Sequence, residues 1–371
     1  MTDQAARAGA ILSIDLEAIC ANWRNLHARQ KPGSQTAAVV KADAYGLGAA
    51  RVAPALLAAG CRRFVVATLD EAIALRPLLP GAEILVLSGP FPGGEAEFHA
   101  YGLLPVLNSP AQVSGWAAFA RERGEQLACV LHIDTGMGRL GLRHEEARRL
   151  SEDRESLSAM DLRLVMTHMA CADEPDHPLN QLQLERFAAA RAFFPGIEGS
   201  LAASSAIFLG QNWHADWTRP GYALYGGNPT PGQPNPMGQV VRLQGRIIQV
   251  RDVDAGDTVG YGATHRCAAP TRLAVVAAGY ADGLFRSLGN RGCGHLGDYR
   301  VPLVGRVSMD LTIFDIGGAP KSAARPGAMI DLIGPKNTID DVAAAAGTIG
   351  YEVLTSLSPR YHRDYLEGAA L

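Results

Sequence analysis

The sequence predicts an α/β fold in which an N-terminal (β/α)8 TIM barrel is followed by a mostly β C-terminal domain. Short apolar runs alternate with amphipathic helical stretches from residue 36 to residue 226, a pattern typical of parallel strands joined by helices. A Pro-, Gly- and Asn-rich linker, GNPTPGQPNPMG, comes next, and beyond it strand-like runs are separated by Gly, Pro and Asp turns. We therefore assign residues 1–230 to the barrel and residues 231–371 to the β-domain, with residues 1–16 open to pairing with the β-domain.

The predicted barrel strands are short and apolar along their whole length, as expected of strands that are buried on both faces. Helix candidates lie between them, and several begin with an Asp, a Ser-Pro pair or a similar N-terminal signal. Eight such units favour a closed barrel over an open doubly wound sheet. The strands are expected at residues 36–42, 62–68, 82–89, 103–109, 127–135, 161–170, 199–204 and 221–226.

The C-terminal region contains strand-like stretches that are interrupted by turns rather than by long helices. One helical segment, residues 338–357, is expected near the end. AILSIDL at residues 10–16 has the pattern of a strand outside the barrel count, so it is a candidate to join this sheet. The C-terminal stretches are VVRLQGRIIQVRDV, TRLAVVAAGYADG, YRVPLVGRVSMDLTIFDI and AMIDLIG.

The composition of the 371-residue chain is that of an ordinary globular protein, with 47% hydrophobic and 19% charged residues. A net charge of -3 without a basic run gives no electrostatic footprint for nucleic acid or for an anionic membrane. The sequence has no apolar window long enough to span a bilayer, and its first residues lack a signal-peptide pattern. The six cysteines are scattered singly, which fits reduced thiols and no metal site. We therefore expect a cytoplasmic protein.

Lys41 lies in VVKADAYGLG, at the inner end of the first predicted strand. A lysine in this position either extends its ammonium to water or loses its charge, because burying a lone cation is costly. A desolvated lysine loses its proton more easily, and its free amine can condense with a carbonyl group to form a Schiff base. The local sequence alone also fits a surface lysine in a strand-to-helix loop.

Other polar residues follow the predicted strands at their carboxyl ends, where the active sites of such barrels lie. Each has an ordinary structural explanation by itself, such as a helix cap or a hydrogen-bonded core histidine. Together they place a lysine, guanidinium groups and candidate anion-binding groups on one rim, which suits a phosphorylated aldehyde cofactor. The set consists of Lys41, Tyr45, Asp134, Arg139, His168, Ser204, Ser205, Arg219, Gly221 and Tyr225.

Nine motifs, spread across essentially the whole chain, resemble in the same order those of the alanine racemases, which are fold-type III pyridoxal 5'-phosphate enzymes. The motifs are VVKADAYGLG, HIDTGMGRLG, THMACADE, ASSA, RPGYALYG, VGYGAT, GYADG, GRVSMD and LSPRYHR. The resemblance implies a cofactor-binding barrel, a C-terminal β-domain and the interconversion of L-alanine and D-alanine. It also implies a homodimer in which the β-domain of one chain completes the barrel mouth of the other.

Racemisation needs an electron sink, which pyridoxal phosphate supplies. It also needs two bases, because a single base returns the proton to the face from which it came. The resemblance makes Lys41 the Schiff-base lysine and one base, and Tyr261 of VGYG the other base. A phenol with an ordinary pKa of about 10 needs cationic neighbours to act at neutral pH, and His168 and Arg219 resemble the family's network for this purpose. Because guanidinium keeps its proton, Arg219 is expected to donate to the pyridine nitrogen without protonating it.

The remaining contacts also come from the resemblance. Arg139 is expected to reach the ring oxygen of the cofactor and to lie near the substrate carboxylate. Met309 is expected to help to hold that carboxylate through its backbone, and Tyr280 to line the entrance. Backbone amides at a glycine turn form an anion-binding nest. The expected phosphate ligands are Tyr45, Ser205 and the backbone N–H groups of Gly221 and Tyr222.

Four positions depart from the family pattern. Leu47 stands where a histidine is common, and Ser204 where an asparagine is common. His132 replaces a lysine that is carbamylated in some relatives, so a different partner has to position Arg139. Pro359 stands where some relatives supply a tyrosine hydroxyl to the phosphate, which weakens that contact. None of these changes affects the reaction class that the motifs imply.

Other activities on the same scaffold remain alternatives: a racemase for serine or of broad specificity, a D-amino-acid lyase or a decarboxylase. A decarboxylase of this fold usually carries a catalytic cysteine in the β-domain, and Cys267 and Cys293 lie in no such motif. Carriers of pyridoxal phosphate stop at the barrel, whereas this chain adds a β-domain with Tyr261. The sequence leaves open whether the enzyme supplies D-alanine for the cell wall or degrades it, and how far it distinguishes alanine from serine.

Overall fold

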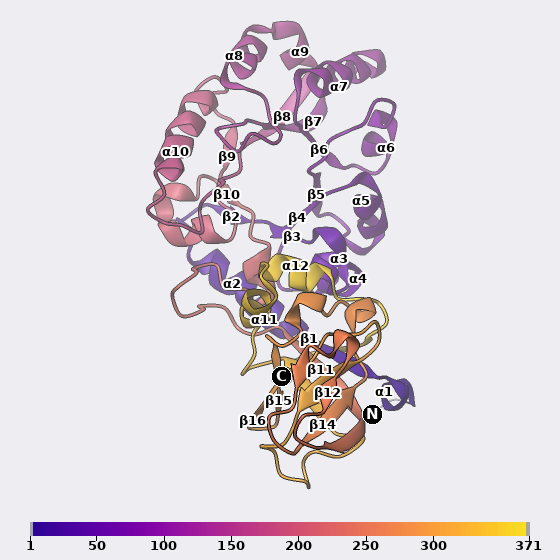
Figure 1. Ribbon diagram of the computed structural model, residues 1–371. Coiled ribbons are helices and arrows are strands. Elements are labelled where there is room, and N and C mark those ends of the chain that lie inside the picture. The colour runs from indigo at the N-terminus through magenta and orange to yellow at the C-terminus, as the bar shows by residue number, and fades with distance from the viewer. Residues whose placement is uncertain (1–2, 369–371) are drawn as a thin grey trace.

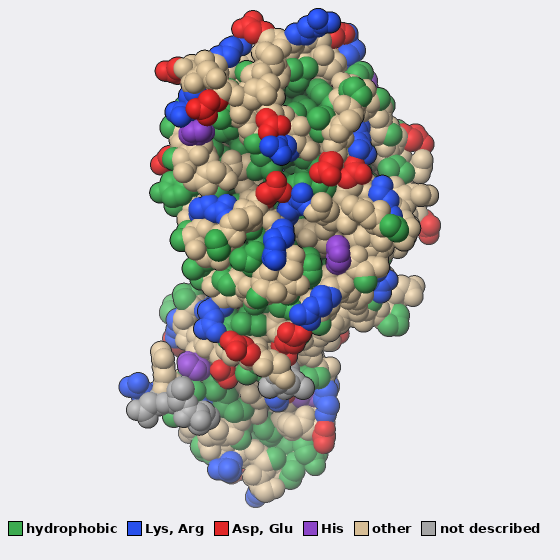
Figure 2. All heavy atoms as spheres, turned by 180° about the vertical axis from the view of Figure 1, so that it is seen from behind, with side chains coloured by type: hydrophobic (Ala, Val, Ile, Leu, Met, Phe, Trp, Pro, Cys, Tyr) green, Lys and Arg blue, Asp and Glu red, His purple; other side chains and the backbone are tan. Residues whose placement is uncertain are grey.

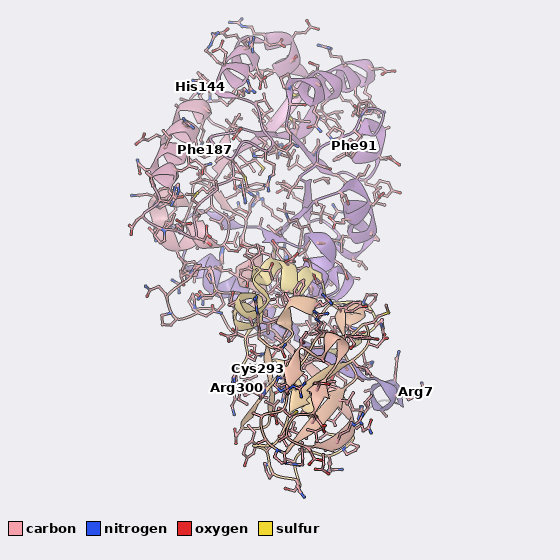
Figure 3. All side chains as sticks on the ribbon, in the orientation of Figure 1. Arg7, Phe91, His144, Phe187, Cys293 and Arg300 are labelled. Atoms are coloured by element: carbon pink, nitrogen blue, oxygen red, sulfur yellow. The ribbon has the colours of Figure 1, made fainter. Side chains whose placement is uncertain are left out.

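The computed structural model describes residues 3–368, and the chain forms a barrel and a β-rich part (Figure 1). Short strands make a ring that is surrounded by helices, and the β-rich part lies beyond one side of this ring, next to both ends of the chain. Side chains project into the space that the ribbon leaves open inside the ring (Figure 3). The predicted α/β architecture, an N-terminal barrel followed by a mostly β part, is confirmed.

The barrel sheet contains nine short strands within the described residues, and each is parallel to its neighbours. They are β2 (Gln35–Thr36), β3 (Ala38–Val39), β4 (Arg63–Val66), β5 (Glu83–Val86), β6 (Leu104–Leu107), β7 (Leu127–His132), β8 (Met160–Met166), β9 (Glu198–Ser200) and β10 (Trp217–Thr218). The hydrogen-bonded order runs from β2 through β10, β9, β8, β7, β6, β5 and β4 to β3. β2 and β3 are separated only by Ala37, whose amide donates to the carbonyl of Thr218 at 2.9 Å. The two ends of the sheet are therefore one stretch of chain, and the sheet closes on itself.

The predicted strand at residues 221–226 is wrong. This segment forms a short 3-10 helix, η4 (Tyr222–Tyr225), and β10 takes the last place in the barrel. The hydroxyl of Ser204 accepts hydrogen bonds from the amides of Gly221 and Ala223, at 3.1 and 3.2 Å, and so caps the start of a helical turn. A short apolar run does not distinguish a buried strand from a buried helical turn.

Helices cover the outside of the barrel and begin where the sequence provides caps. α5 (Leu69–Leu75) begins after Thr68, which forms a capping box with the third helical residue. α7 (Pro110–Arg123) begins after Ser109 and ends at Gly124, which has a φ of 68°. The other helices of this part are α2 (Leu16–Ala28), α3 (Lys41–Gly46), α4 (Ala49–Ala58), α6 (Glu95–Ala100), α8 (His144–Glu152), α9 (Arg154–Ala159) and α10 (Pro178–Arg191).

The second sheet combines the first strand of the chain with strands from its last third. In the described part of the chain it comprises β1 (Ala10–Asp15), β11 (Val241–Val253), β14 (Thr271–Val276), β15 (Cys293–Leu296), β16 (Tyr299–Pro302), β17 (Thr312–Asp315), β18 (Met329–Ile333) and β19 (His362–Leu366). β1 lies between β11, its antiparallel partner, and β19, its parallel partner. The strand predicted at residues 10–16 therefore pairs with this sheet and not with the barrel.

Two small elements carry residues of interest. The hairpin of β12 (Thr258–Val259) and β13 (His265–Arg266) holds the turn η5 (Tyr261–Ala263) at its tip. The helices α11 (Ile339–Ala346) and α12 (Gly350–Thr355) lie between the second sheet and the barrel, and α12 contacts the turn that begins at Lys41 (Figure 1). The predicted helical segment at residues 338–357 corresponds to these two helices.

The surface carries charges of both signs. Figure 2 shows acidic and basic side chains interspersed over one face of the molecule, without a large area of one sign. No helix within residues 3–368 is both long and apolar enough to cross a membrane.

Asn22 joins α2 to the segment that leads into β11, and we use it to test that junction. Its buried amide group donates to the carbonyls of Leu224 and Gly238, at 3.2 and 2.9 Å, and its oxygen accepts from the Gly238 amide at 2.7 Å. Asn22→Ala leaves these backbone groups unpaired, so we expect the free energy of unfolding in urea to fall by about 2 to 4 kcal/mol. Asn25 lies on the same helix and donates to the carbonyl of Pro236 at 3.3 Å in a half-buried contact, and it accepts from the exposed side chain of Arg29 at 3.1 Å. Asn25→Ala should cost less than about 1 kcal/mol, because both contacts are open to solvent. Equal decreases in the free energy of unfolding in the two variants would show that Asn22 contributes no more to the junction than Asn25 does.

Candidate active site

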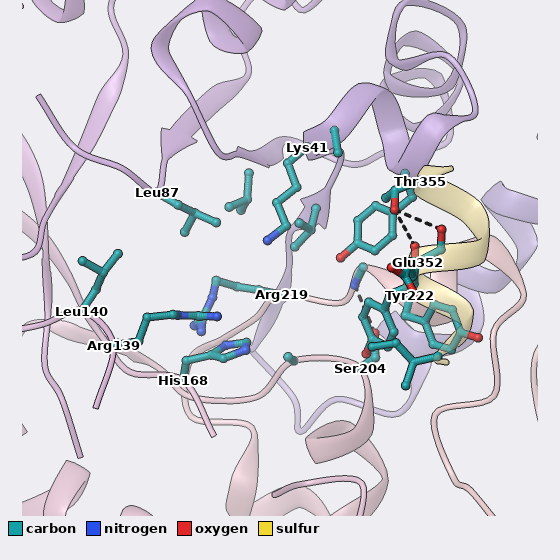
Figure 4. Close-up of a pocket in the computed structure, with 18 of the residues that line it drawn as sticks. Lys41, Leu87, Arg139, Leu140, His168, Ser204, Arg219, Tyr222, Glu352 and Thr355 are labelled. Carbon is teal, nitrogen blue, oxygen red and sulfur yellow. Dashed lines mark hydrogen bonds between the residues drawn. The ribbon is translucent and has the colours of Figure 1, made fainter. Parts of the chain in front are cut away.

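A cavity of about 680 Å³ opens at the carboxyl ends of the barrel strands (Figure 4). Lys41 follows β3, and Arg139 comes from the loop after β7. His168 follows β8, and Arg219 follows β10. Residues of α12 line the side that faces the second sheet. The predicted site residues that meet in this cavity are Lys41, Tyr45, Arg139, His168, Arg219, Gly221 and Tyr222.

Lys41 begins a turn with an unusual backbone, residues 41–48, here called the Lys41 turn. Its first part is assigned as α3 (Lys41–Gly46), but the four residues 42–45 have left-handed φ angles between 52° and 56°. None of the four is glycine, and because each such residue costs about 1 to 2 kcal/mol, the turn stores roughly 4 to 8 kcal/mol. Strain of this kind persists only where the surrounding structure holds it, and it clusters at functional sites. Lys41 and Tyr45, at the two ends of the strained stretch, both line the cavity.

The amine of Lys41 lies in a positively charged environment. Burial is the main cause that lowers its pKa, the charge of Arg139 lowers the pKa further, and Glu71 opposes this effect. A lower pKa increases the fraction of free amine, which is the form that attacks a carbonyl carbon. The surroundings of Lys41 therefore suit a reactive lysine better than an ordinary surface lysine.

The guanidinium of Arg219 is buried and fixed by two acceptors. Its Nη2 donates to the carbonyl of Thr167 at 2.6 Å, and its Nη1 donates to the hydroxyl of Ser200. Burial lowers the pKa of Arg219 to about 10, so that the group remains charged at neutral pH. Because guanidinium has donors and no acceptor, Arg219 can only donate into the cavity.

His168 lies beside these cations and is held in its neutral form. Burial, followed by the charges of Arg219 and Arg139, lowers its pKa to about 3. Its backbone carbonyl accepts from the side chain of Gln183, which also bonds Thr135. The resemblance implies that His168 and Arg219 act together as cationic neighbours of the phenol, but in this environment Arg219 supplies the positive charge and His168 does not.

His132 is held by a partner that the sequence analysis did not identify, Asn108 at the end of β6. The Nδ1 atom of His132 lies 2.8 Å from Oδ1 of Asn108. The amide nitrogen of Asn108 donates to the carbonyls of Leu87 and Val106, both at 2.9 Å, which leaves its oxygen for His132. Nδ1 therefore carries the proton, and Nε2 is an acceptor. Burial and the charge of Arg219 lower the pKa of His132 to about 4.

Two residues of the predicted strand-end set shape the frame of the cavity. The carboxylate of Asp134 accepts from three successive amides in the loop that leads to Arg139, at 2.9 to 3.1 Å. Tyr225 is fully buried, and its hydroxyl donates to the carbonyl of Val39 at 2.8 Å. Both residues fix backbone around the site and neither lines the cavity.

The far end of the cavity contains three of the four residues predicted to bind the phosphate, Tyr45, Gly221 and Tyr222. Ser204 lines it and caps the amides of Gly221 and Ala223. A Cβ at Gly221 would lie 2.2 Å from the hydroxyl oxygen of Tyr45, so glycine is needed for this close approach. Ser205, which begins the 3-10 helix η2 (Ser205–Leu209), is half-buried and is not among the cavity-lining residues.

Tyr222 is locked in place by the second sheet's helices. Its hydroxyl donates to the carboxylate of Asp340 at 2.7 Å, and its ring stacks on Tyr351 with centroids 4.1 Å apart. A Cβ at Gly350 would lie 1.6 Å from that hydroxyl, so the first residue of α12 must be glycine. This contact ties the phosphate end of the cavity to α11 and α12.

The cavity fits a phosphorylated aldehyde. One end presents an amine with a lowered pKa, and the other end presents the hydroxyl of Tyr45, a hydrogen-bond donor for an anion, beside Gly221 at the start of η4. Among the described residues that line the cavity, Glu352 is the only acidic one. The cavity wall therefore supplies little negative charge to balance its basic groups. An anionic ligand relieves this imbalance.

Three predicted site residues lie elsewhere. Tyr261, Tyr280 and Met309 belong to the β-rich part, with exposed fractions of 70%, 43% and 53%, and none of the three lines the cavity of its own chain. Tyr280 and Met309 are neighbours, because the amide of Ala281 donates to the carbonyl of Met309 at 2.9 Å. A single chain therefore does not bring Tyr261 to Lys41.

Some lining residues were missed because no motif marks them. Ile349, Tyr351 and Glu352 reach the cavity from the segment around α12, which the sequence predicts only as a helix. Leu47, at a position where histidine is common, is fully buried in the core. No cluster of three or more His, Cys, Asp or Glu side chains in residues 3–368 is arranged to hold a metal ion.

Comparison with protein families gives two matches that together span most of the chain. Residues 14–229 match the model of the alanine racemase N-terminal domain. Residues 240–365 match that of the alanine racemase C-terminal domain.

The relatives and the solved structure that the chain resembles are also alanine racemases. The chain is 55% identical to an alanine racemase of Rhodospirillum rubrum, over 97% of this chain and 96% of the relative. It is 50% identical to a catabolic alanine racemase of Agrobacterium fabrum, over 98% and 94%. It also resembles the crystal structure of the Bartonella henselae alanine racemase with covalently bound pyridoxal phosphate, with a TM-score of 0.93, 37% identity and coverage of 97% of this chain and 100% of that one.

The buried neutral form of His132 should make the cofactor-free protein sensitive to acid. Its pKa is lower in the folded chain, about 4, than the ordinary value of 6.5, so the unfolded chain binds the proton first and stability falls as the pH drops through this window. Between pH 7 and pH 5, His132 alone should account for a loss on the order of 2 kcal/mol in the free energy of unfolding. His132→Gln should remove this part of the loss in urea titrations at the two pH values. His144→Gln, at an exposed histidine of α8, should retain it, and an unchanged pH difference in His132→Gln would mean that the ring is not held neutral.

Proposed function

This chain belongs to the alanine racemase family and interconverts the enantiomers of alanine with pyridoxal 5'-phosphate, and from this premise we propose that Lys41 and Tyr261 act as its two bases. The observation that carries the assignment of Lys41 is its place in the cavity, where burial and Arg139 lower its pKa. Pyridoxal phosphate, when bound, supplies the electron sink that allows the α-carbon of alanine to release a proton.

The residues that would hold the cofactor follow from the chemistry of each group. The amine of Lys41 is the nucleophile for its aldehyde carbon. Arg219 would donate to the pyridine nitrogen. This role is supported by its guanidinium, which is buried and is held in place by two hydrogen bonds. Arg219 keeps its own proton, so it would donate to that nitrogen without protonating it, which would favour return of the proton to the substrate over loss of the amino group. The groups assigned to the phosphate are Tyr45, Ser205 and the amides of Gly221 and Tyr222.

His168 and Arg139 complete this environment. Neutral His168 offers a ring nitrogen without adding charge beside Arg219. Arg139 faces the cavity from a loop that Asp134 holds in shape, which supports its assignment to the ring oxygen of the cofactor and to the substrate carboxylate. We assign the backbone of Met309 to the same carboxylate and Tyr280 to the entrance.

Each base serves one face of the α-carbon. The amine of Lys41 takes or returns the proton on one face, and the phenol of Tyr261 does so on the other. Tyr261 lies at the tip of an exposed hairpin and not in the cavity of its own chain. We therefore propose a homodimer in which the β-rich part of each chain places Tyr261, Tyr280 and Met309 at the partner's cavity.

We also propose that the protein works in the cytoplasm. The described cysteines are all free thiols, and four of the six are buried, as expected in a reducing compartment.

Replacement of Tyr261 tests the two-base assignment. Tyr261→Phe should lower racemisation by at least about a hundredfold in both directions, because one base is lost. Exchange of the α-proton with deuterated solvent, followed by mass spectrometry, should survive much better from one enantiomer than from the other. Tyr299→Phe, at another exposed tyrosine of the β-rich part, should change neither rate. Equal loss of exchange from both enantiomers would argue for a single base.

Mixed dimers test whether the site is shared. Lys41→Ala and Tyr261→Phe are each expected to be inactive, but in a mixed dimer of a shared-site enzyme both lesions fall in one site and the other site is intact. Refolding an equal mixture should pair half of the chains into mixed dimers, so roughly a quarter of the wild-type activity should return. Native mass spectrometry verifies that mixed dimers have formed. If they form and activity stays at the level of the parent variants, each Tyr261 serves its own chain and the shared site is wrong.

A further inference from the structure

The Lys41 turn has its own internal hydrogen bonds, but they leave several backbone groups to be satisfied from outside. The amide of Ala44 donates to the carbonyl of Val40, and the amide of Gly48 donates to that of Asp43, both at 2.9 Å. The carboxylate of Asp43 accepts from the amide of Ala49 at 2.7 Å. These contacts lie within the turn and its flanking residues, including the first residue of α4. They do not fix the position of the turn relative to the cavity.

One outside contact holds the beginning of the turn. The carboxylate of Glu71 accepts from the amide of Ala42 at 2.6 Å, and its other oxygen accepts from the amide of Ala67 at 2.8 Å. Glu71 therefore bridges the turn to the loop between β4 and α5. The beginning of the turn is therefore held by the barrel part of the chain, since Glu71 and Ala67 both belong to it.

Two outside contacts hold the end of the turn, and both come from β19. Nη2 of Arg363 donates to the carbonyl of Gly46 at 2.8 Å. The hydroxyl of Tyr365 donates to the carbonyl of Leu47 at 3.1 Å. Carbonyls at the end of a helical turn have no partner within it, so these two donors from the last strand satisfy groups that the turn cannot satisfy alone.

The packing at this point leaves no room for adjustment. A Cβ at Gly46 would lie 2.5 Å from the carbonyl oxygen of Leu354, in α12, and a Cβ at Gly48 would lie 2.0 Å from the hydroxyl of Tyr365. Both glycines have positive φ angles, 81° and 92°. The turn is thus pressed against α12 and β19, and its position depends on where those elements stand.

We propose that Arg363 and Tyr365 are positioning residues for the reaction, because they fix the strained turn that carries Lys41 and Tyr45 into the cavity. Neither residue lines the cavity, so they act through the backbone of the turn and not on the ligand. β19 pairs with β1 in the second sheet, and the β-rich part thereby sets the position of the reactive amine. This proposal rests on the assignment of Lys41 as the cofactor-binding lysine.

The test uses the holoenzyme and variants that remove one donor at a time. Arg363→Met should speed the loss of pyridoxal phosphate on dialysis about tenfold or more and lower kcat by a similar factor, because the charged donor to Gly46 is lost. The variant also removes the contacts of Arg363 with the carbonyls of Leu357 and Ser358, at 3.2 and 3.3 Å. Tyr365→Phe, which keeps the ring, should produce the same two changes by about threefold to tenfold. KM for alanine should stay nearly constant in both variants, since neither side chain reaches the substrate.

A matched variant separates positioning from general stability. Arg246, in β11 of the same sheet, donates to the carbonyls of Ala8 and Ala5 at 3.0 and 3.1 Å and does not touch the turn. Arg246→Met should lower the urea midpoint as much as Arg363→Met does, but it should leave cofactor loss and kcat at wild-type values. Arg363→Lys, which retains a donor, should recover part of the cofactor affinity.

Two outcomes would overturn the proposal, and both can be told apart from a failure of the Lys41 assignment. If Tyr365→Phe and Arg363→Met retain the cofactor as the wild type does, or if Arg246→Met loses it equally fast, β19 has only a structural role. Borohydride reduction of the wild-type holoenzyme followed by peptide mapping tests the lysine independently. Attachment to a lysine other than Lys41 would refute the assignment of Lys41, whatever the β19 variants do.

Discussion

Positive charge concentrated at the mouth of the barrel is the constraint on which the rest of the site depends. Lys41, Arg139 and Arg219 surround one cavity, and Glu352 is the only acidic residue among the described residues that line it. Burial is the largest cause that lowers the pKa of Lys41 and of the neighbouring histidines, and the surrounding cations lower these pKa values further. Anions relieve the repulsion between the cations, and a phosphate and a carboxylate are the anions that this reaction brings. The same cluster of cations therefore favours binding of the ligands and adds to the reactivity of the amine.

The barrel could be predicted from the sequence because strands buried on both faces leave a simple apolar pattern. The same pattern failed at residues 221–226, since it does not register that the hydroxyl of Ser204 caps two amides there. The strand at residues 10–16 was also identified, but its partners were not. Its position between β11 and β19 is a matter of long-range register, which no local pattern contains.

The sequence predicted which residues lie around Lys41 much better than it predicted how they are arranged. Motifs located the residues that the structure gathers around Lys41, yet the sequence ADAY after it contains no glycine, and propensity alone favours an ordinary right-handed turn. The left-handed turn depends on Glu71 and on Arg363, which is far away in the sequence. The partner of His132 was unpredictable for the same reason, because Asn108 follows a neighbouring strand, β6. Tyr261 cannot be placed at all from one chain.

The location of β1 matters for how the chain is made. A ribosome releases β1 before the barrel strands, whereas its two partners, β11 and β19, emerge after them. While the barrel is synthesised, both edges of β1 therefore lack their partner strands, and an unpaired apolar strand is prone to wrong pairing. β19 closes this side of the sheet and also brings Arg363 and Tyr365 to the Lys41 turn. A nascent chain that stops before β19 can close its barrel and still lack the support of its reactive lysine, so synthesis of β19, and not barrel closure, completes the support of the site.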